Sequence, residues 1–413
     1  MKIRSSKMSG LVVVVSAGAL MASGAMATTS ANAGEKITKS SFGIHSFVED
    51  PGVRAGTIRM NMWPNWRQLN PAKGQYDWPL MDQTIATVKS WGFKDVLYVF
   101  GNTPQWAAGP VMWPDRELEP GSTAAPSKMK YWKNFATKLV KKYKKDIDHY
   151  QAWNEITSPQ FYQGTAKQMA KMTKILNTIV NKYDKSATVV SGSVQTHAQA
   201  YYDRMATPYF AALRAKGWPV DVVSGHFYPT GKGGPDKRIS QINMFKNDVN
   251  KYGRPGRVKM WDTEANFWTT VPNKVPPNPN GRVRGKKAAT YVARNYLDTW
   301  RTGLKRSYWY MWTVGAQDLG FPGIQMRSDL APARVAYNRL ADWTIGSKYQ
   351  GCSTKGTLVQ CTFKKGGKFQ VVFTTSGRDK LNVGNKTVCP VYSGSCRKGK
   401  GTISVGTLPL KVG

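Results

Sequence analysis

The stretch His149-Tyr-Gln-Ala-Trp-Asn-Glu155 is a strand-like run that ends in a glutamate beside a tryptophan. A second stretch, Val258-Lys-Met-Trp-Asp-Thr-Glu264, has the same form. Glutamates are scarce in this 413-residue chain, so two that end strands in aromatic settings indicate chemistry. Two carboxylates from distant segments are the groups that acid/base catalysis and nucleophilic attack on a glycosidic bond require.

Outward from these two runs, short β-branched or aromatic segments alternate with amphipathic segments between about residues 40 and 343. The sequence predicts strands at Phe42–His45, Thr57–Asn61, Val96–Phe100, Tyr150–Trp153, Thr188–Ser191, Val222–His226, Val258–Thr263 and Ser307–Trp312. It predicts helices at Pro79–Trp91, Ser127–Tyr143, Thr165–Tyr183, Tyr202–Ala215, Ile239–Tyr252, Lys286–Gly303 and Pro332–Trp343. Ser127 and Thr165 are expected N-caps, and only the first crossover, between Ser46 and Arg54, lacks clear helix signals.

Eight strands with crossover helices over about 300 residues predict an α/β fold, a (β/α)₈ TIM barrel spanning residues 34–344. A doubly wound sheet fits less well, because no Gly-rich phosphate turn follows the first strand. In a barrel, the residues that follow the strands line the active site. Glu155 and Glu264 then follow the fourth and seventh strands.

After Trp343 the helical periodicity stops, and short alternating runs are separated by Gly, Ser and Lys. Residues 345–413 are therefore expected to form a small β-rich accessory domain. All four cysteines lie here: Cys352, Cys361, Cys389 and Cys396. An even number of cysteines in an exported protein indicates disulfides. Three pairings are open, of which the short loops Cys352–Cys361 and Cys389–Cys396 are the simplest, and the spacing disfavours zinc.

Residues 1–33 have the features of a secretory signal peptide. Lys2, Arg4 and Lys7 precede a short apolar run, and small-x-small cleavage sites end at Ala27 and Ala33. The alternative, an N-terminal membrane anchor, is disfavoured because the apolar run is too short to span a bilayer. We therefore expect a secreted protein, extracellular or associated with the cell wall, with no membrane span.

The chain carries 60 basic and 24 acidic residues, which gives a net charge of +36. This balance favours attraction to polyanions such as acidic polysaccharide, teichoic acid, anionic lipid or nucleic acid. The alternative is a lysine-rich surface that serves only solubility. A specific nucleic-acid function is not expected, because no reading module is present.

Several candidate site residues lie near the two glutamates. Glu155 is the candidate acid/base and Glu264 the candidate nucleophile, with Asp262 as a fallback that strand alternation places on the same side as Glu264. The candidate substrate-binding residues all fall at or beyond strand ends: Arg59, Trp63, Trp106, Asn154, His226, Tyr228, Trp268 and Trp312.

The chemistry of each candidate side chain suggests a role in the site. Arg59 could keep Glu264 ionised by its charge, and His226 and Tyr228 could hold the Glu264 carboxylate. Asn154 could donate to a sugar hydroxyl, and aromatic rings stack on the C–H faces of sugars. None of the four histidines has metal-ligand spacing with another, so no metal site is expected.

The region from Phe42 to Trp343 resembles the clan A glycoside hydrolases, and within them family 39. The matching stretches are Arg59-Met-Asn61, Trp66–Trp78, Thr103-Pro-Gln-Trp106, Trp153-Asn-Glu155 and Asp262-Thr-Glu264. The resemblance implies a (β/α)₈ barrel, with Glu155 as acid/base and Glu264 as nucleophile. Ile156 stands where the clan motif often has proline.

The sequence therefore predicts a secreted retaining O-glycoside hydrolase that cleaves a polysaccharide or cell-wall glycan, including an anionic one, and needs no cofactor. The alternative is a carbohydrate-binding or cell-wall-associated protein without catalysis. The sugar, the linkage and the oligomeric state stay open at this stage.

Overall fold

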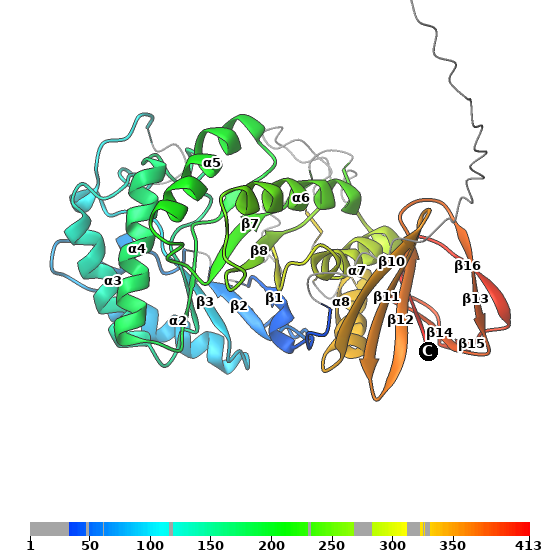
Figure 1. Cartoon of the computed structure of the whole chain (residues 1–413). Helices are drawn as coiled ribbons and strands as arrows, with labels where there is room; N and C mark the ends of the chain where they lie inside the picture. The colour runs from blue at the N-terminus through cyan, green and yellow to red at the C-terminus, as the bar shows by residue number, and fades with distance from the viewer. Residues whose placement is uncertain are drawn as a thin grey trace, which may run out of the picture.

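The computed structural model describes residues 33–46, 49–60, 62–114, 119–229, 233–267, 283–311, 323–324, 326 and 331–413. A closed parallel β-barrel surrounded by helices is followed by antiparallel sheets at the C-terminal end (Figure 1). The fold class predicted from the sequence is confirmed. The predicted signal segment lies outside the described residues except for Ala33.

Eight parallel strands close the barrel. They are β1 (Phe42–Ile44), β2 (Thr57–Met60), β3 (Val96–Val99), β4 (His149–Gln151), β5 (Thr188–Val190), β7 (Val222–His226), β8 (Lys259–Ala265) and β9 (Ser307–Trp309). Pairing of β1 with β9 and of β5 with β7 completes the ring. A two-residue strand, β6 (Val194–Gln195), extends the sheet beside the end of β7. A closed ring excludes the doubly wound alternative.

Side chains fill the barrel interior, as they do in a TIM barrel. One interior cluster joins residues of five strands: Leu97, Val190, Val222, Trp261 and Tyr308. Gly43 of β1 makes room for it, because a Cβ at this position would lie 2.4 Å from the Tyr308 ring. The interior is thus a packed core. Polar groups gather where the strands end, and a second polar cluster around Asp95, His149 and Arg306 lies where they begin.

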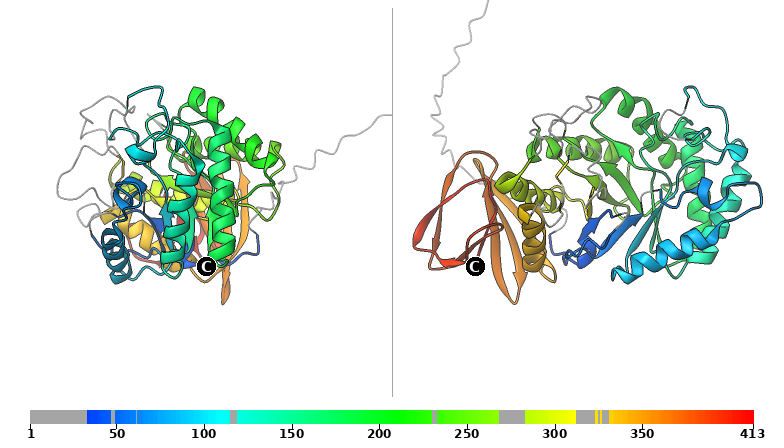
Figure 2. Two further views of the ribbon diagram at one scale, coloured as in Figure 1. Left: turned by 90° about the vertical axis from the view of Figure 1, so that its left-hand side faces the viewer. Right: turned by 180° about the vertical axis from the view of Figure 1, so that it is seen from behind.

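The helices lie outside the strands, as the two further views in Figure 2 show. They are η1 (Lys39–Ser41), α1 (Trp66–Leu69), α2 (Trp78–Ser90), η2 (Gln105–Ala107), α3 (Met129–Tyr143), α4 (Ala166–Tyr183), α5 (Gln199–Ala215), α6 (Pro235–Lys251), α7 (Gly285–Arg301) and α8 (Ala331–Thr344). Residues 45–46 and 49–56, between β1 and β2, contain no helix. Among the described residues, no helix has the length and apolar character needed to cross a membrane.

The predicted helix starts are partly correct. Thr165 caps α4 through a capping box with Gln168, as expected. Ser127 was the expected cap of α3, but Lys128 occupies that position, and the Ser127 hydroxyl donates to the Ala107 carbonyl instead. That loop contact competes with capping because serine hydroxyls bond readily to nearby backbone.

The C-terminal part of the chain folds into two antiparallel sheets. The larger contains β10 (Lys348–Lys355), β11 (Leu358–Lys365), β12 (Gly367–Thr374), β17 (Leu410–Val412), β14 (Thr387–Pro390) and β15 (Arg397–Lys398), and the smaller contains β13 (Asp379–Gly384) and β16 (Gly401–Val405). Disulfides join Cys352 to Cys361 and Cys389 to Cys396, so the simplest pairing is confirmed.

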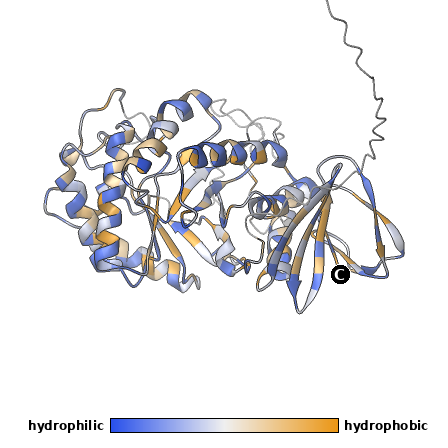
Figure 3. Ribbon diagram, in the orientation of Figure 1, coloured by the Kyte–Doolittle hydropathy of each residue, from blue (hydrophilic) through white to orange (hydrophobic). Residues whose placement is uncertain are grey.

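The larger sheet packs against the barrel through one face. Tyr349 and Phe363 contact the ring of Trp300 in α7, with centroids 6.4 and 5.9 Å away. Along the strands of this sheet, apolar and polar residues alternate (Figure 3). The other edge of β10 pairs with the start of the described chain, since Tyr349 N donates to Glu35 O and Ile37 N donates to Ser347 O. Residues 34–37 and the last strand, β17, therefore join the same sheet.

Candidate active site

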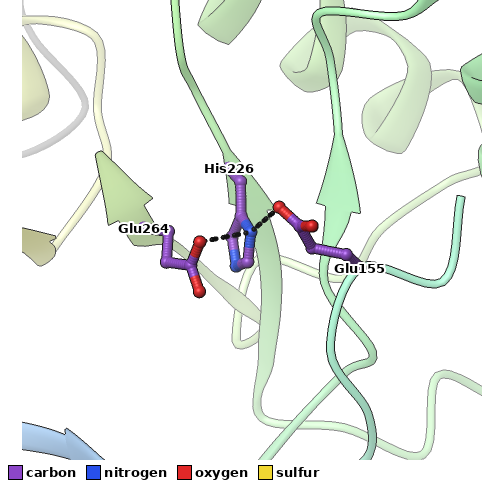
Figure 4. A group of neighbouring side chains, drawn as sticks. All are labelled: Glu155, His226 and Glu264. Atoms are coloured by element: carbon purple, nitrogen blue, oxygen red, sulfur yellow. Dashed lines mark hydrogen bonds and ion pairs between the residues drawn. The ribbon is translucent and has the colours of Figure 1, made fainter. Parts of the chain in front are cut away.

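Two glutamates and a histidine converge where β4, β7 and β8 end. Figure 4 shows His226 between Glu155 and Glu264. His226 Nδ1 lies 2.8 Å from Glu155 Oε1 and 3.4 Å from Glu264 Oε2. One oxygen of each carboxyl and one nitrogen of His226 all lie within 4.8 Å of one another. Glu155 and Glu264 are 6 % and 5 % exposed as residues, so their carboxyls interact in a largely desolvated setting.

Glu155 is held by the segment that contains β6. Its backbone has a φ of +39°, a conformation that non-glycine residues adopt rarely and that is enriched at functional sites. The Glu155 amide donates to Ser193 Oγ at 2.9 Å, which fixes this turn. The Gln195 side-chain amide donates to Glu155 Oε2. Backbone and side chain are thus both fixed by the same short segment.

Glu264 is held by β2 and by the loop after β7. Arg59 Nη1 donates to Glu264 Oε1 at 2.6 Å, and the Tyr228 hydroxyl donates to Oε2 at 2.8 Å. The same guanidinium donates to Gln151 Oε1 and to Asn154 Oδ1, both at 2.8 Å. Arg59 therefore joins the end of β4 to the Glu264 carboxylate, and its planar fork sets the angle between them.

A β-bulge decides the direction of Glu264. The pairing of β7 with β8 shifts between Gly225 and His226, and that of β8 with β9 shifts between Asp262 and Ala265. Because an extra residue breaks the alternation, the prediction that Asp262 lies on the same side as Glu264 is wrong. Asp262 instead accepts hydrogen bonds from Arg238 of α6 and from Ser307, and it is fully buried.

Burial and charge separate the two glutamates electrostatically. Burial raises the pKa of Glu155 well above its usual value, and the negative charge of Glu264 raises it further. Burial also raises the pKa of Glu264, but the charge of Arg59 and the hydroxyl of Tyr228 oppose that increase. In the pair, the proton therefore belongs on Glu155 and the negative charge on Glu264.

His226 is a neutral ring in this setting. Burial lowers its pKa well below the ordinary value, and the charge of Arg59 adds to the effect. With its Nδ1 hydrogen toward Glu155, its Nε2 accepts from Thr263 Oγ1 at 3.0 Å. His45 adjoins the same strand end, where its Nε2 donates to the Thr263 carbonyl at 3.1 Å. Both histidines thus hold Thr263, the residue of β8 that precedes Glu264.

Glu155, His226 and Glu264 are also the group of described residues whose ligand atoms could hold a metal ion. The donor set argues against one. All four carboxylate oxygens already accept a hydrogen bond, from His226, Gln195, Arg59 and Tyr228. The Arg59 guanidinium, 2.6 Å from Glu264, would also repel a cation.

The predicted aromatic substrate-binding residues lie in different surroundings. Tyr228 contacts Glu264, as described above. Trp63 is half-exposed and lines a cavity of about 190 Å³ with Ser46 and residues of α2. Trp106 donates to Asn70 O and packs against Tyr131 of α3. Neither tryptophan hydrogen-bonds to the glutamate pair among the described residues.

The two remaining aromatic candidates, Trp268 and Trp312, lie outside the described residues, as does Asn61. Trp66, which begins one of the stretches that resemble family 39, is fully buried and stacks on Phe135 of α3, so it belongs to the core.

The structure adds residues that the sequence did not single out. Gln195, Ser193, Gln151 and Tyr310 all lie at strand ends or in adjoining turns. Tyr310 is partly buried, and its ring centroid lies 5.0 Å from that of His45. Its pKa is raised by burial and then by the charge of Glu264. Gln151 and Tyr310 carried some signal, since both lie within predicted strands, whereas Ser193 and Gln195 do not.

No protein-family model matches the chain, and no curated protein sequence matches it. Solved structures do match. A family 39 glycoside hydrolase from the gut symbiont Bacteroides cellulosilyticus aligns with a TM-score of 0.67 and 17 % identity, covering 92 % of this chain and 82 % of that one.

Two further structures align over nearly the whole chain. A monomeric beta-xylosidase from Caulobacter crescentus gives a TM-score of 0.61 and 13 % identity, covering 94 % of this chain and 97 % of that one. A family 30 subfamily 8 xylanase from Clostridium acetobutylicum gives a TM-score of 0.57 and 12 % identity, covering 92 % of this chain and 97 % of that one. The chain therefore has the (β/α)₈ fold of the clan A glycoside hydrolases, as the resemblance of its motifs indicated.

Proposed function

We propose that this protein is a retaining O-glycoside hydrolase in which Glu264 is the nucleophile and Glu155 the acid/base. The observation that carries the proposal is the Glu155–Glu264 pair, two buried carboxyls with oxygens within 4.8 Å and pKa values set apart by their surroundings. Retaining enzymes hold their carboxyl groups about 5–5.5 Å apart, whereas inverting enzymes leave about 6.5–9.5 Å for a water.

In the first step, the Glu264 carboxylate attacks the anomeric carbon while protonated Glu155 gives its proton to the leaving oxygen. The glycosidic C–O bond breaks and a glycosyl ester forms on Glu264. In the second step, ionised Glu155 takes a proton from water, which attacks the same carbon and releases the sugar and the Glu264 carboxylate.

The neighbouring side chains have distinct roles in this scheme. Arg59 and Tyr228 hold Glu264 ionised and aimed. Both hydrogen bonds weaken when the ester forms, because hydrogen bonds to a charged group are stronger than those to a neutral one. Once the charge of Glu264 is lost to the ester, the pKa of Glu155 falls, because that charge was one cause of its increase. The same carboxyl can then serve as acid first and as base second.

Exposed aromatic side chains support a carbohydrate substrate. The half-exposed rings of Trp63, Trp113 and Tyr201 all lie in segments that follow barrel strands. Rings in this position can stack on sugars. The proposal leaves the sugar and the linkage open, and a polysaccharide or cell-wall glycan is the substrate class we infer.

We also infer that the protein is exported. Two disulfides and the signal-like residues 1–33 support this, because disulfides persist in oxidising compartments.

The alternative function is glycan binding without cleavage, and one experiment separates the two. Purified protein is assayed against a panel of polysaccharides and aryl glycosides, beside its Glu264→Ala variant. Turnover that disappears in the variant supports the hydrolase. Tight glycan binding with no turnover of any panel member would replace it with the binding protein.

A further inference from the structure

Four lysines form a continuous row across the outer edge of the C-terminal sheet. Lys36 pairs with Lys348 of β10, Lys348 pairs with Lys364 of β11, and Lys364 pairs with Lys368 of β12. Residues directly opposite one another in antiparallel strands point to the same face. The four side chains therefore stand side by side, one per strand, at the strand spacing of about 4.7–4.9 Å.

The row faces away from the barrel. Its neighbours in sequence, Ile37, Tyr349, Phe363 and Phe369, are buried, and Tyr349 and Phe363 pack on Trp300. By alternation the lysines point to the opposite side, and all four are exposed. The smaller sheet leaves this end uncovered, because its apolar contacts are with Leu358 and Val372 at the other end of the strands.

Nothing among the described residues neutralises the row. None of its four ammonium groups forms an ion pair or a side-chain hydrogen bond with another described residue. Between residues 345 and 413 the only acidic residue is Asp379, which lies on the smaller sheet. Like charges directly opposite each other destabilise a sheet. An arrangement that costs stability at three successive pairs calls for a function outside folding.

A cross-strand pair of polar residues lies beside the lysine row on the same face of the sheet. Thr362 and Gln370 are directly opposite each other, two residues from Lys364 and Lys368 along their strands. Both are partly exposed, and neither side chain hydrogen-bonds to another described residue. A hydroxyl and an amide here can bond to sugar hydroxyls while the lysines bind anions.

We propose that Lys36, Lys348, Lys364 and Lys368 form a docking site for a linear anionic polysaccharide with carboxylates on successive sugar units. The polymer lies across the strands, with its carboxylates on the ammonium groups and its hydroxyls on Thr362 and Gln370. Lysines suit such a partner, because flexible point charges follow a polymer without demanding bidentate geometry. The choice of a glycan over another polyanion rests on the proposed function. The site itself is separate from Glu155 and Glu264.

The test is a binding titration of the full chain with polygalacturonate oligomers, read by calorimetry. Every protein carries Glu264→Ala, so that the polymer is not cut and any binding at the barrel is common to all. The row variant combines Lys36→Gln, Lys348→Gln, Lys364→Gln and Lys368→Gln. The matched control makes the same charge change on α3 and α4 with Lys133→Gln, Lys167→Gln, Lys171→Gln and Lys174→Gln, all at exposed positions.

We expect the row variant to lose affinity by roughly tenfold or more and to show a weaker salt dependence, while the control changes by less than about twofold. A double variant, Lys348→Gln with Lys364→Gln, should lose an intermediate amount of affinity for polygalacturonate. It keeps the proposal testable if the quadruple variant fails to fold. Thermal unfolding should not fall in either, since repulsion is being removed.

Three results would overturn the proposal. Equal losses in the row variant and the control would mean that net charge alone attracts the polymer. Unchanged binding in the row variant would place the polymer elsewhere. The third result concerns inorganic polyphosphate. If it binds as tightly as polygalacturonate, and if the row variant loses affinity for both to the same degree, the row binds polyanions in general. Because binding is measured without turnover, a chain with no hydrolase activity could still show the row-dependent affinity.

Discussion

Arg59 and Glu264 form a buried ion pair in which the guanidinium of β2 meets the carboxylate of β8 at 2.6 Å. Both side chains are almost inaccessible to solvent, so the attraction is weakly screened. The pair also crosses the barrel opening, which means that the charge on the proposed nucleophile is set by a strand distant in sequence.

Replacing Arg59 with methionine should reduce kcat strongly and move the acidic limb of the pH–rate profile to higher pH. The guanidinium lowers the pKa of Glu264, so its removal lets burial raise that pKa further. The profile of kcat/KM against pH measures the shift. Gln151→Ala, which removes a different contact of Arg59, is the control and should shift the limb less. An unmoved acidic limb in Arg59→Met would contradict the assigned pairing.

The two glutamates should respond differently to an activated aryl glycoside. Such a leaving group needs no proton, so Glu155→Ala should form the glycosyl-enzyme and then hydrolyse it slowly, with added azide restoring turnover. Glu264→Ala should not form the intermediate and should lose roughly 10⁴-fold or more in rate. Mass spectrometry of the stalled protein detects the adduct. Wild-type activity in both variants would end the assignment.

Gln195 should affect the position of the basic limb in the profile of kcat/KM against pH. Its amide donates to Glu155, and that hydrogen bond lowers a pKa that burial and Glu264 raise. Gln195→Leu should therefore move the basic limb to higher pH, because Glu155 keeps its proton longer. Gln195→Glu tests the sign independently, since an added negative charge should move the limb in the same direction. A shift to lower pH in either variant would refute the stated cause.

Asp262 should make the protein lose stability as pH rises through weakly acidic values. Burial raises its pKa from 3.8 to about 6 in the folded state. The folded protein therefore binds an extra proton between these values, and the free energy of unfolding falls as pH increases across them, by about 3 kcal/mol. Denaturant unfolding from pH 3.5 to 7 measures the slope. Asp262→Asn should flatten it, although the variant is less stable overall because Arg238 loses a partner.

The disulfides should stabilise the accessory sheets by limiting the unfolded chain. The bridge from Cys352 to Cys361 closes a loop with a separation of 9 residues, which corresponds to about 2.5 kcal/mol in the chain-entropy account. Replacing both cysteines with serine should lower the unfolding free energy by about that amount and leave kcat unchanged, because the bridge is remote from Glu155. A loss of kcat at a temperature where the variant stays folded would show that the sheet influences the site.

The sequence was sufficient for the barrel because each strand ended in a recognisable change of pattern. Thr57–Met60 and Val222–His226 alternate with amphipathic helices, and Arg59 and His226 became candidates because they lie near the ends of these strands. The direction of Asp262 could not be predicted, because the bulge in β8 depends on its pairing with β7 and β9. Gln195 could not be predicted as a site residue either, because a two-residue strand has no periodicity that a sequence pattern could reveal.

The pairing of residues 34–37 with β10 has a consequence for how the chain assembles. The first described segment completes its hydrogen bonds only with a strand that is synthesised after the entire barrel. Contacts so distant in sequence form late, since the loop that they close is long. We therefore expect the N-terminal segment to remain unpaired during synthesis and to dock last, so that its protection from proteases reports the completion of folding.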